Sequence, residues 1–136
     1  MKAFSFSVWI FFLILLACLT SGVHAQTQLP LSLPVTESGV QVVKLSEDSL
    51  STSYYIVVHD EVKPHYHARH SEHIVVIEGE GLMRMNADTI ALSPGIHVFI
   101  PSGTIHAVKV TSDGPLGVLS IQTPRFDPTD RISVVD

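Results

Sequence analysis

Short stretches of alternating apolar and polar residues, separated by turn-forming residues, make up most of the chain after residue 40. Alternation with a period of two predicts half-buried β-strands, because successive strand side chains point to opposite faces. Turns recur at close spacing, for example at Asn86-Ala87-Asp88 and Ser93-Pro94-Gly95, and no convincing helical period follows residue 25. The pattern predicts an all-β fold, a sandwich or small barrel of about nine strands. The predicted strands span residues 41–44, 54–58, 61–67, 72–77, 82–85, 89–92, 96–100, 105–110 and 116–121.

One predicted strand, residues 72–77, carries apolar residues on both faces. If Glu72 points inward, Ile74 does so as well, whereas Val75 and Ile77 point to the opposite face. A strand that is apolar on both sides is normally covered on both sides. We therefore expect a second sheet or a second subunit to cover the outer face of this strand.

The first 25 residues have the pattern of a secretory signal. Lys2 is followed by an apolar run over residues 8–19, which is short for a transmembrane helix, and the segment ends in Val23-His24-Ala25. We expect cleavage after this segment, export to the periplasm or the exterior, and no membrane span in the mature protein. Two alternatives remain open: an uncleaved anchor, and a lipoprotein attached through Cys18.

The rest of the chain divides into an arm, a barrel and a tail. Residues 26–39 are polar and interrupted by prolines, and residues 40–123 hold the predicted strands. Residues 124–136 form a tail, which is either an ordered strap across the barrel, anchored by Phe126, or a frayed terminus. A chain of 136 residues is long enough for one domain of this kind.

Composition and charge exclude some sources of stability and some partners. The only cysteine, Cys18, lies in the predicted signal, so the mature chain has no disulfide. Its stability must come from the apolar core, from a metal or from oligomerisation. The net charge is −5 and the sequence has no basic cluster, so nucleic acid is not expected as a partner.

Three histidines and one glutamate carry the candidate chemistry. His65 and His67 are separated by one residue, so on a strand their imidazoles share one face, with Cα atoms roughly 6.5–7 Å apart. Glu72 opens the next strand after a tight connection, and a hairpin would fold its carboxylate back toward the histidines. His106, on a later strand, is a fourth candidate ligand. Three imidazoles and one carboxylate suit one divalent ion, which is Zn, Fe, Mn, Ni or Cu.

The same residues resemble the two sequence motifs of the cupin family. The first motif is matched by His65-x-His67, four residues, Glu72, six residues and Gly79. The second motif is matched by Gly95, five residues, Pro101-x-Gly103, two residues and His106. Together the two motifs lie within residues 64–110, and their internal spacing matches at both ends.

Two positions depart from the cupin pattern, and neither is a metal ligand in the family. His59 stands where the family usually has glycine, and Val110 stands where it usually has asparagine. The resemblance implies a small double-sheet, jelly-roll-like β-barrel with the metal inside it. It also implies a small-molecule ligand and a homodimer, which is common among cupins.

The other histidines have less defined roles. His59 belongs either to the rim of the site or to an ordinary strand, depending on whether the strand continues unbroken. His70 lies in the connection between two strands and is expected to be exposed. His73 should face away from Glu72, and His97 is expected at the rim of the pocket.

The site permits three classes of function. The first is a metal-dependent enzyme, an oxygenase, isomerase or lyase acting on a small anionic or oxygenated molecule. The second is a module that binds a small ligand or a metal without turnover, and the third is a barrel with a purely structural metal. Tyr54, Tyr55 and His59 are near the motif in sequence but cannot be placed. Catalytic residues beyond the metal ligands are therefore left unassigned.

We predict that the mature protein is a homodimer, because the outer apolar face of residues 72–77 would otherwise be exposed. Light scattering at micromolar concentration should give twice the mass of one chain. A chain lacking residues 26–33 serves as the control and should remain dimeric. A monodisperse monomer would contradict the prediction.

Overall fold

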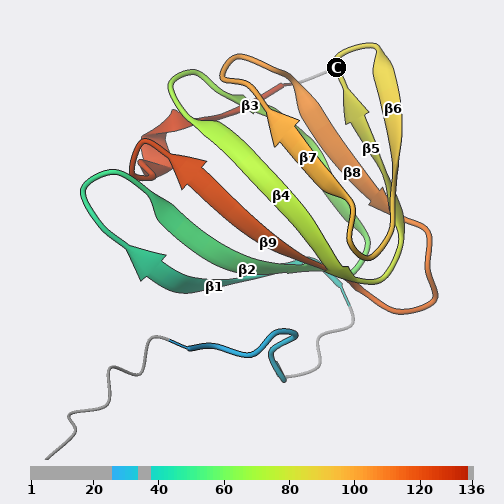
Figure 1. Cartoon of the computed structure of the whole chain (residues 1–136). Coiled ribbons are helices and arrows are strands. Elements are labelled where there is room, and N and C mark those ends of the chain that lie inside the picture. Colours follow the sequence, from blue (N-terminus) through green and yellow to red (C-terminus); the bar gives the residue numbers. More distant parts are fainter. Residues whose placement is uncertain (1–25, 34–37, 135–136) are drawn as a thin grey trace, which may run out of the picture.

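The computed structural model describes residues 26–33 and 38–134, and this part of the chain is almost entirely β-structure. Two antiparallel five-stranded sheets lie face to face (Figure 1). The prediction of an all-β, double-sheet barrel is confirmed. The predicted signal, residues 1–25, lies outside the described residues. Among the residues that are described, no helix is long and apolar enough to cross a membrane.

The chain passes back and forth between the two sheets, and among the described strands only the pairs β1–β2 and β5–β6 are consecutive strands of the same sheet. The first sheet has the order β1-β2-β9-β4-β7 and contains β1 (Val40–Glu47), β2 (Thr52–Val58), β4 (Ser71–Glu78), β7 (His97–Ile100) and β9 (Leu116–Thr123). The second has the order β10-β3-β8-β5-β6 and contains β3 (Glu61–His67), β5 (Gly81–Met85), β6 (Asp88–Leu92), β8 (His106–Val110) and β10 (Arg131–Ser133). The strands β1 to β9 correspond to the predicted strands, whereas β10 was not predicted. Because β3 and β8 face β4 and β9, the histidine and glutamate motifs meet between the sheets.

Side chains on the inner faces form the core in the alternating pattern that the sequence predicts. In β4 the inner residues Glu72, Ile74 and Val76 are buried, whereas Val75 and Ile77 on the outer face are half-buried. Burial of each such apolar side chain stabilises the fold by about 1.5–3 kcal/mol. Both sheets contribute to one buried cluster, which consists of Val58, Ile74, Val76, Met83, Leu92, Val98, Ile100, Val108, Leu116 and Val118.

The outer face of the first sheet carries an aromatic group at β4 and β7. His73 stacks on His97 with ring centroids 5.3 Å apart, and the ring of Phe99 lies 4.7 Å from that of His73. Phe99 is 48% exposed, and with the two imidazoles it forms an aromatic patch on this face. His73 faces away from Glu72, as predicted. Dimer formation through this face stays a prediction.

The segment after β9 is an ordered strap rather than a frayed terminus. It contains a short 3₁₀ helix, η1 (Pro128–Asp130), capped by Asp127, and it continues into β10, which pairs with β3. Phe126 packs edge-on against Tyr54, with ring centroids 5.7 Å apart, and against His67 at 6.4 Å. Phe126 is therefore the aromatic anchor of the strap and lies beside a candidate ligand.

Asp130 joins the strap to the turn between β3 and β4. Its buried carboxylate accepts hydrogen bonds from the backbone N–H groups of Arg69 and His70 at 3.0–3.1 Å and from Nε of Arg69 at 3.2 Å. Nδ1 of His70 lies 2.8 Å from the same carboxylate. Burial alone would raise the pKa of Asp130, but these donors outweigh burial and hold the pKa below its ordinary value. The ionised carboxylate is thus fully partnered within the protein.

Gly79 is required by the close approach of two turns. Its φ is +75°, and a Cβ atom at this position would lie 2.2 Å from the carbonyl oxygen of Pro115. A larger residue would have to displace backbone as well as adopt a disfavoured conformation. Gly95 and Gly103 also have positive φ values.

We predict that Asp130→Asn lowers the free energy of unfolding of the metal-free protein by about 2 kcal/mol, because the amide nitrogen would face backbone donors. The pKa of Asp130 is lower in the folded protein than in the unfolded chain. Its stabilisation is therefore complete above the unfolded pKa of about 3.9 and is lost as the pH falls through the folded pKa. Urea unfolding between about pH 6 and about pH 2 measures both effects. Asp113→Asn, in an exposed loop, is the control, and equal acid sensitivity of wild type and Asp130→Asn would contradict the prediction.

Candidate metal centre

The four predicted ligands come together between the two sheets. His65 and His67 lie on β3, and His106 lies on β8 directly opposite His65. The three ring centroids are 4.2–5.6 Å apart, and one nitrogen of each ring lies within 4.8 Å of the other two. Glu72 reaches them from β4 in the facing sheet, and its Oε2 lies 3.7 Å from Nε2 of both His67 and His106. All four side chains are buried.

Backbone carbonyls orient two of the imidazoles. Nδ1 of His65 lies 2.9 Å from the carbonyl oxygen of Lys63, and Nδ1 of His106 lies 2.9 Å from that of Thr104. A carbonyl oxygen can only accept, so each Nδ1 carries the proton and each Nε2 keeps its lone pair. Hydrogen bonding of one ring nitrogen in this way is how proteins present the other nitrogen to a metal.

Burial lowers the pKa values of His65 and His67. Desolvation, followed by the neighbouring charge of His106, lowers the pKa of His65 to about 3. Desolvation also lowers the pKa of His67, although the carboxylate of Glu72 acts in the opposite direction. A neutral imidazole is the form that binds a metal ion, so no proton has to leave His65 before binding at neutral pH.

Glu72 has one oxygen held by the protein and one that faces the histidines. Ser120 Oγ and Gln122 Nε2 donate hydrogen bonds to Oε1, the latter at 3.4 Å. Oε2 instead faces Nε2 of His67 and of His106, and Nε2 of His106 has no proton to donate because Nδ1 carries it. Buried acceptors that face one another are unfavourable unless a cation lies between them.

The spacing of these atoms fits a divalent ion with little adjustment. Two ligand atoms bound at about 2.1 Å to one ion are about 3.0–3.4 Å apart at octahedral to tetrahedral angles. The two contacts of Glu72 Oε2 at 3.7 Å are only slightly longer. The donor set, its tautomers and its spacing therefore fit one divalent metal ion.

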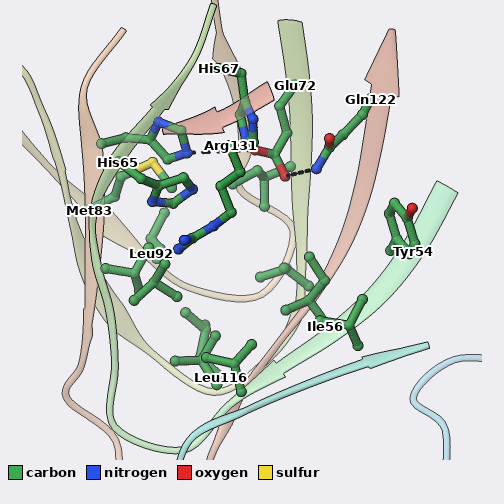
Figure 2. A pocket seen from close by; sticks show the side chains of 18 of the residues that line it. Tyr54, Ile56, His65, His67, Glu72, Met83, Leu92, Leu116, Gln122 and Arg131 are labelled. Carbon is green, nitrogen blue, oxygen red and sulfur yellow. Dashed lines mark hydrogen bonds and ion pairs between the residues drawn. The ribbon is translucent and has the colours of Figure 1, made fainter. Parts of the chain in front are cut away.

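A cavity of about 390 Å³ adjoins the candidate ligands (Figure 2). The ligands form one wall, and most of the remaining lining is apolar. The apolar lining residues are Val40, Val42, Ile56, Val58, Val62, Ile74, Met83, Leu92, Val108, Leu116, Val118 and Phe126. The polar lining residues other than the ligands are Tyr54, Gln122 and Arg131. The volume is in the range of small-molecule sites.

Sequence reasoning missed three residues that support or line the site. Ser120 and Gln122 are polar at inward positions of β9, where Leu116 and Val118 are apolar, so the period-two pattern contains a signal that could have found them. Arg131 had no such signal, because β10 is too short for a recognisable pattern. Of the two unplaced tyrosines, Tyr54 lines the cavity.

Three histidine predictions can now be compared with the structure. His70 was predicted to be exposed, which is wrong: it is 2% exposed, because the strap covers it and its Nε2 contacts the carbonyl oxygen of Arg125 at 2.9 Å. His97 does not lie at the rim, because the alternation in β7 turns it to the outer face, where it meets His73. His59 lies 3.1 Å from Gln41 and does not line the cavity.

A second group of potential ligand atoms lies behind His67. Atoms of His67, His70 and Asp130 are within 4.8 Å of one another. Asp130 is already occupied by backbone donors and by the guanidinium of Arg69, a cation that disfavours a metal ion nearby. We therefore interpret this group as structural support for the strap and for the imidazole of His67.

The chain is similar to several known proteins. The family model of the cupin domain matches residues 54–122, just over half of the chain. An uncharacterized protein from Aquifex aeolicus (strain VF5) is 30% identical over 95 residues, which cover 70% of this chain and 78% of that protein. Quercetin 2,3-dioxygenase from Bacillus subtilis (strain 168) is 32% identical over 53 residues, which cover 39% of this chain and 16% of that enzyme.

Solved structures share the fold. The structure of KdgF from Halomonas sp. superposes with a TM-score of 0.62 at 22% identity, covering 67% of this chain and 84% of that one. At this identity the likeness concerns the fold. Together with the extent of the family match and of the Aquifex aeolicus relative, these findings establish that the chain belongs to the cupin family.

Proposed function

We propose that this cupin is a metal-dependent enzyme, an oxygenase, isomerase or lyase, that acts on a small anionic or oxygenated molecule. The observation that carries the proposal is the position of the candidate ligands in the wall of a ligand-sized cavity. A divalent ion held by His65, His67, Glu72 and His106 would polarise an oxygen atom of a bound molecule or, if the ion is iron, support oxygen chemistry.

The residues around the ligands prepare the cavity for a molecule with hydrogen-bonding groups. Gln122 Oε1 is buried and has no hydrogen-bond partner among the residues that the structure describes, so it is available to accept from a ligand. Burial, followed by the charge of Glu47, raises the pKa of Tyr54. Its hydroxyl is therefore protonated at neutral pH and can donate. Such contacts are stronger beside apolar walls than in bulk water.

Two alternatives differ from this proposal in what the cavity does. Among the described lining residues there is no histidine, aspartate or glutamate besides the four candidate ligands. The lack of a separate general base favours a module that binds a small molecule without turnover. A purely structural metal is less well supported, because structural sites are closed and have no adjoining cavity. The relationship to quercetin 2,3-dioxygenase supports an enzyme, although it spans only 16% of that protein.

Two further properties belong to the proposal. The pattern of the first 25 residues supports export, and the outer face of β4 and β7, with Phe99 exposed, supports a homodimer. Both properties are compatible with the site, because the cavity lies between the sheets and the proposed contact lies on an outer face.

We predict that the wild type binds one equivalent of divalent metal and that His67→Ala binds it at least about a hundredfold more weakly, because a direct ligand is lost. Elemental analysis and competition with a chelator measure this. His97→Ala is the matched control, since His97 is an exposed histidine on the outer face. His70→Ala is a poor control, because it removes a buried structural contact. Equal metal content in His67→Ala and His97→Ala would refute the assignment.

We also predict that Ile56→Phe weakens turnover or ligand binding while leaving the metal content at one equivalent, because the larger ring narrows the cavity at a position that supplies no candidate ligand. Oxygen consumption and absorbance changes with a panel of small oxygenated compounds report turnover. Leu82→Phe, at an exposed position on β5, is the control. A structural metal would be indicated if the wild type neither bound nor converted any compound in the panel.

A further inference from the structure

Arg131 points into the cavity because of its place in β10. It pairs with His67 in antiparallel register, and residues directly opposite each other project to the same face. The next residue, Ile132, pairs with Tyr66 and projects outward. Figure 2 shows the side chain of Arg131 extending from the region of the imidazoles into the cavity, between His65 and the apolar wall.

The backbone at this position is fixed from both sides. Asp130, the preceding residue, is held by the donors of the β3–β4 turn, and the backbone N–H of Val134 donates to the carbonyl oxygen of Pro64 at 3.0 Å. The strap therefore presents the guanidinium of Arg131 from a defined point beside the site.

Arg131 differs from the other arginines in the described part of the chain. Arg69 pairs with Asp127 and Asp130, and Arg125 pairs with Glu47. Arg84 is exposed on an outward position of β5. Arg131 is also exposed, but unlike Arg84 it lines the cavity, and no ion pair or hydrogen bond joins its side chain to a described residue.

A solvent-accessible guanidinium that lines such a cavity and has no ionic partner is a binding group for an anion. Its planar array of donors matches a carboxylate with two parallel charge-assisted hydrogen bonds. Among the described lining residues Arg131 is the only lysine or arginine, and no helix begins at the cavity. Phosphate groups are usually bound by several cations or by a helix N-terminus, so a singly charged carboxylate fits better.

We propose that the cavity binds a small organic acid whose carboxylate pairs with Arg131 and whose apolar part packs against Ile56 and Leu116. This inference deepens the proposed function and rests on it in one respect, namely that the ligand occupies the cavity beside the candidate metal ligands. The part of the acid nearest to His65 and Glu72 then carries the oxygen atom on which the metal would act.

Calorimetry with hexanoate, and with hexanol as its uncharged counterpart, tests the proposal on metal-free and metal-loaded protein. We expect the wild type to bind hexanoate in both forms and to bind hexanol at least tenfold more weakly, which corresponds to 1.4 kcal/mol. Arg131→Gln should weaken hexanoate binding by a similar factor without changing the affinity for hexanol. Arg84→Gln is the matched control and should leave both affinities unchanged.

Two outcomes would overturn the proposal. One is hexanoate affinity of Arg131→Gln within about twofold of the wild type, and the other is no binding of hexanoate to the wild type at millimolar concentration. If Arg131→Gln does not fold, Arg131→Lys takes its place: it keeps the charge but loses the planar fork, so its hexanoate affinity should fall while its hexanol affinity stays the same. Unchanged hexanoate affinity in Arg131→Lys would then count against the proposal.

The same measurements separate this inference from the metal assignment. Arg131-dependent binding of hexanoate to a protein that takes up no metal would support the carboxylate site and refute the metal-dependent enzyme. If the wild type binds one equivalent of metal that His67→Ala loses, the metal centre is supported. If Arg131→Gln then binds hexanoate as tightly as the wild type, the carboxylate site is refuted.

Discussion

The carboxylate of Glu72, buried between two facing sheets, is the constraint around which this barrel is arranged. A buried charge is unfavourable unless every lone pair has a partner. Ser120 and Gln122 satisfy one oxygen from the neighbouring strand β9. The other oxygen points across the barrel toward imidazoles from β3 and β8. A divalent cation at this point would complete the partnering of the carboxylate and connect the two sheets through side chains.

Comparison with Asp130 shows why one buried carboxylate is structural and the other is a site. Asp130 accepts from the backbone N–H groups of Arg69 and His70 and from a guanidinium, so the protein itself neutralises it. Glu72 faces the imidazoles of His67 and His106, and the Nδ1 proton of His106 is directed to a backbone carbonyl. The carboxylate of Asp130 thus stabilises the contact between the strap and the β3–β4 turn, whereas the carboxylate of Glu72 presents an oxygen atom that could bind a cation.

The strap adds side chains to the site beyond the candidate metal ligands. By tying the C-terminal segment to the β3–β4 turn, Asp130 places Phe126 and Arg131 beside the imidazoles. The candidate metal ligands, an aromatic ring, a hydrogen-bonding amide and one guanidinium then surround a cavity with apolar walls. In such a low-dielectric space a few polar groups can select a ligand strongly, because water competes weakly with them.

The sequence by itself determined the features that depend on neighbouring residues. Period-two alternation predicted β1 to β9 and the inward direction of Glu72 and Ile74, and motif spacing predicted which histidines meet. Tertiary structure alone decided the burial of His70 and the inward direction of Arg131. Both depend on contacts with residues more than fifty positions away, through Asp130 and through the pairing of β10 with β3. The three-residue strand β10 is too short to show an alternating pattern, so the direction of Arg131 could not be predicted. The sequence of the loop that contains His70 does not show whether another segment covers it.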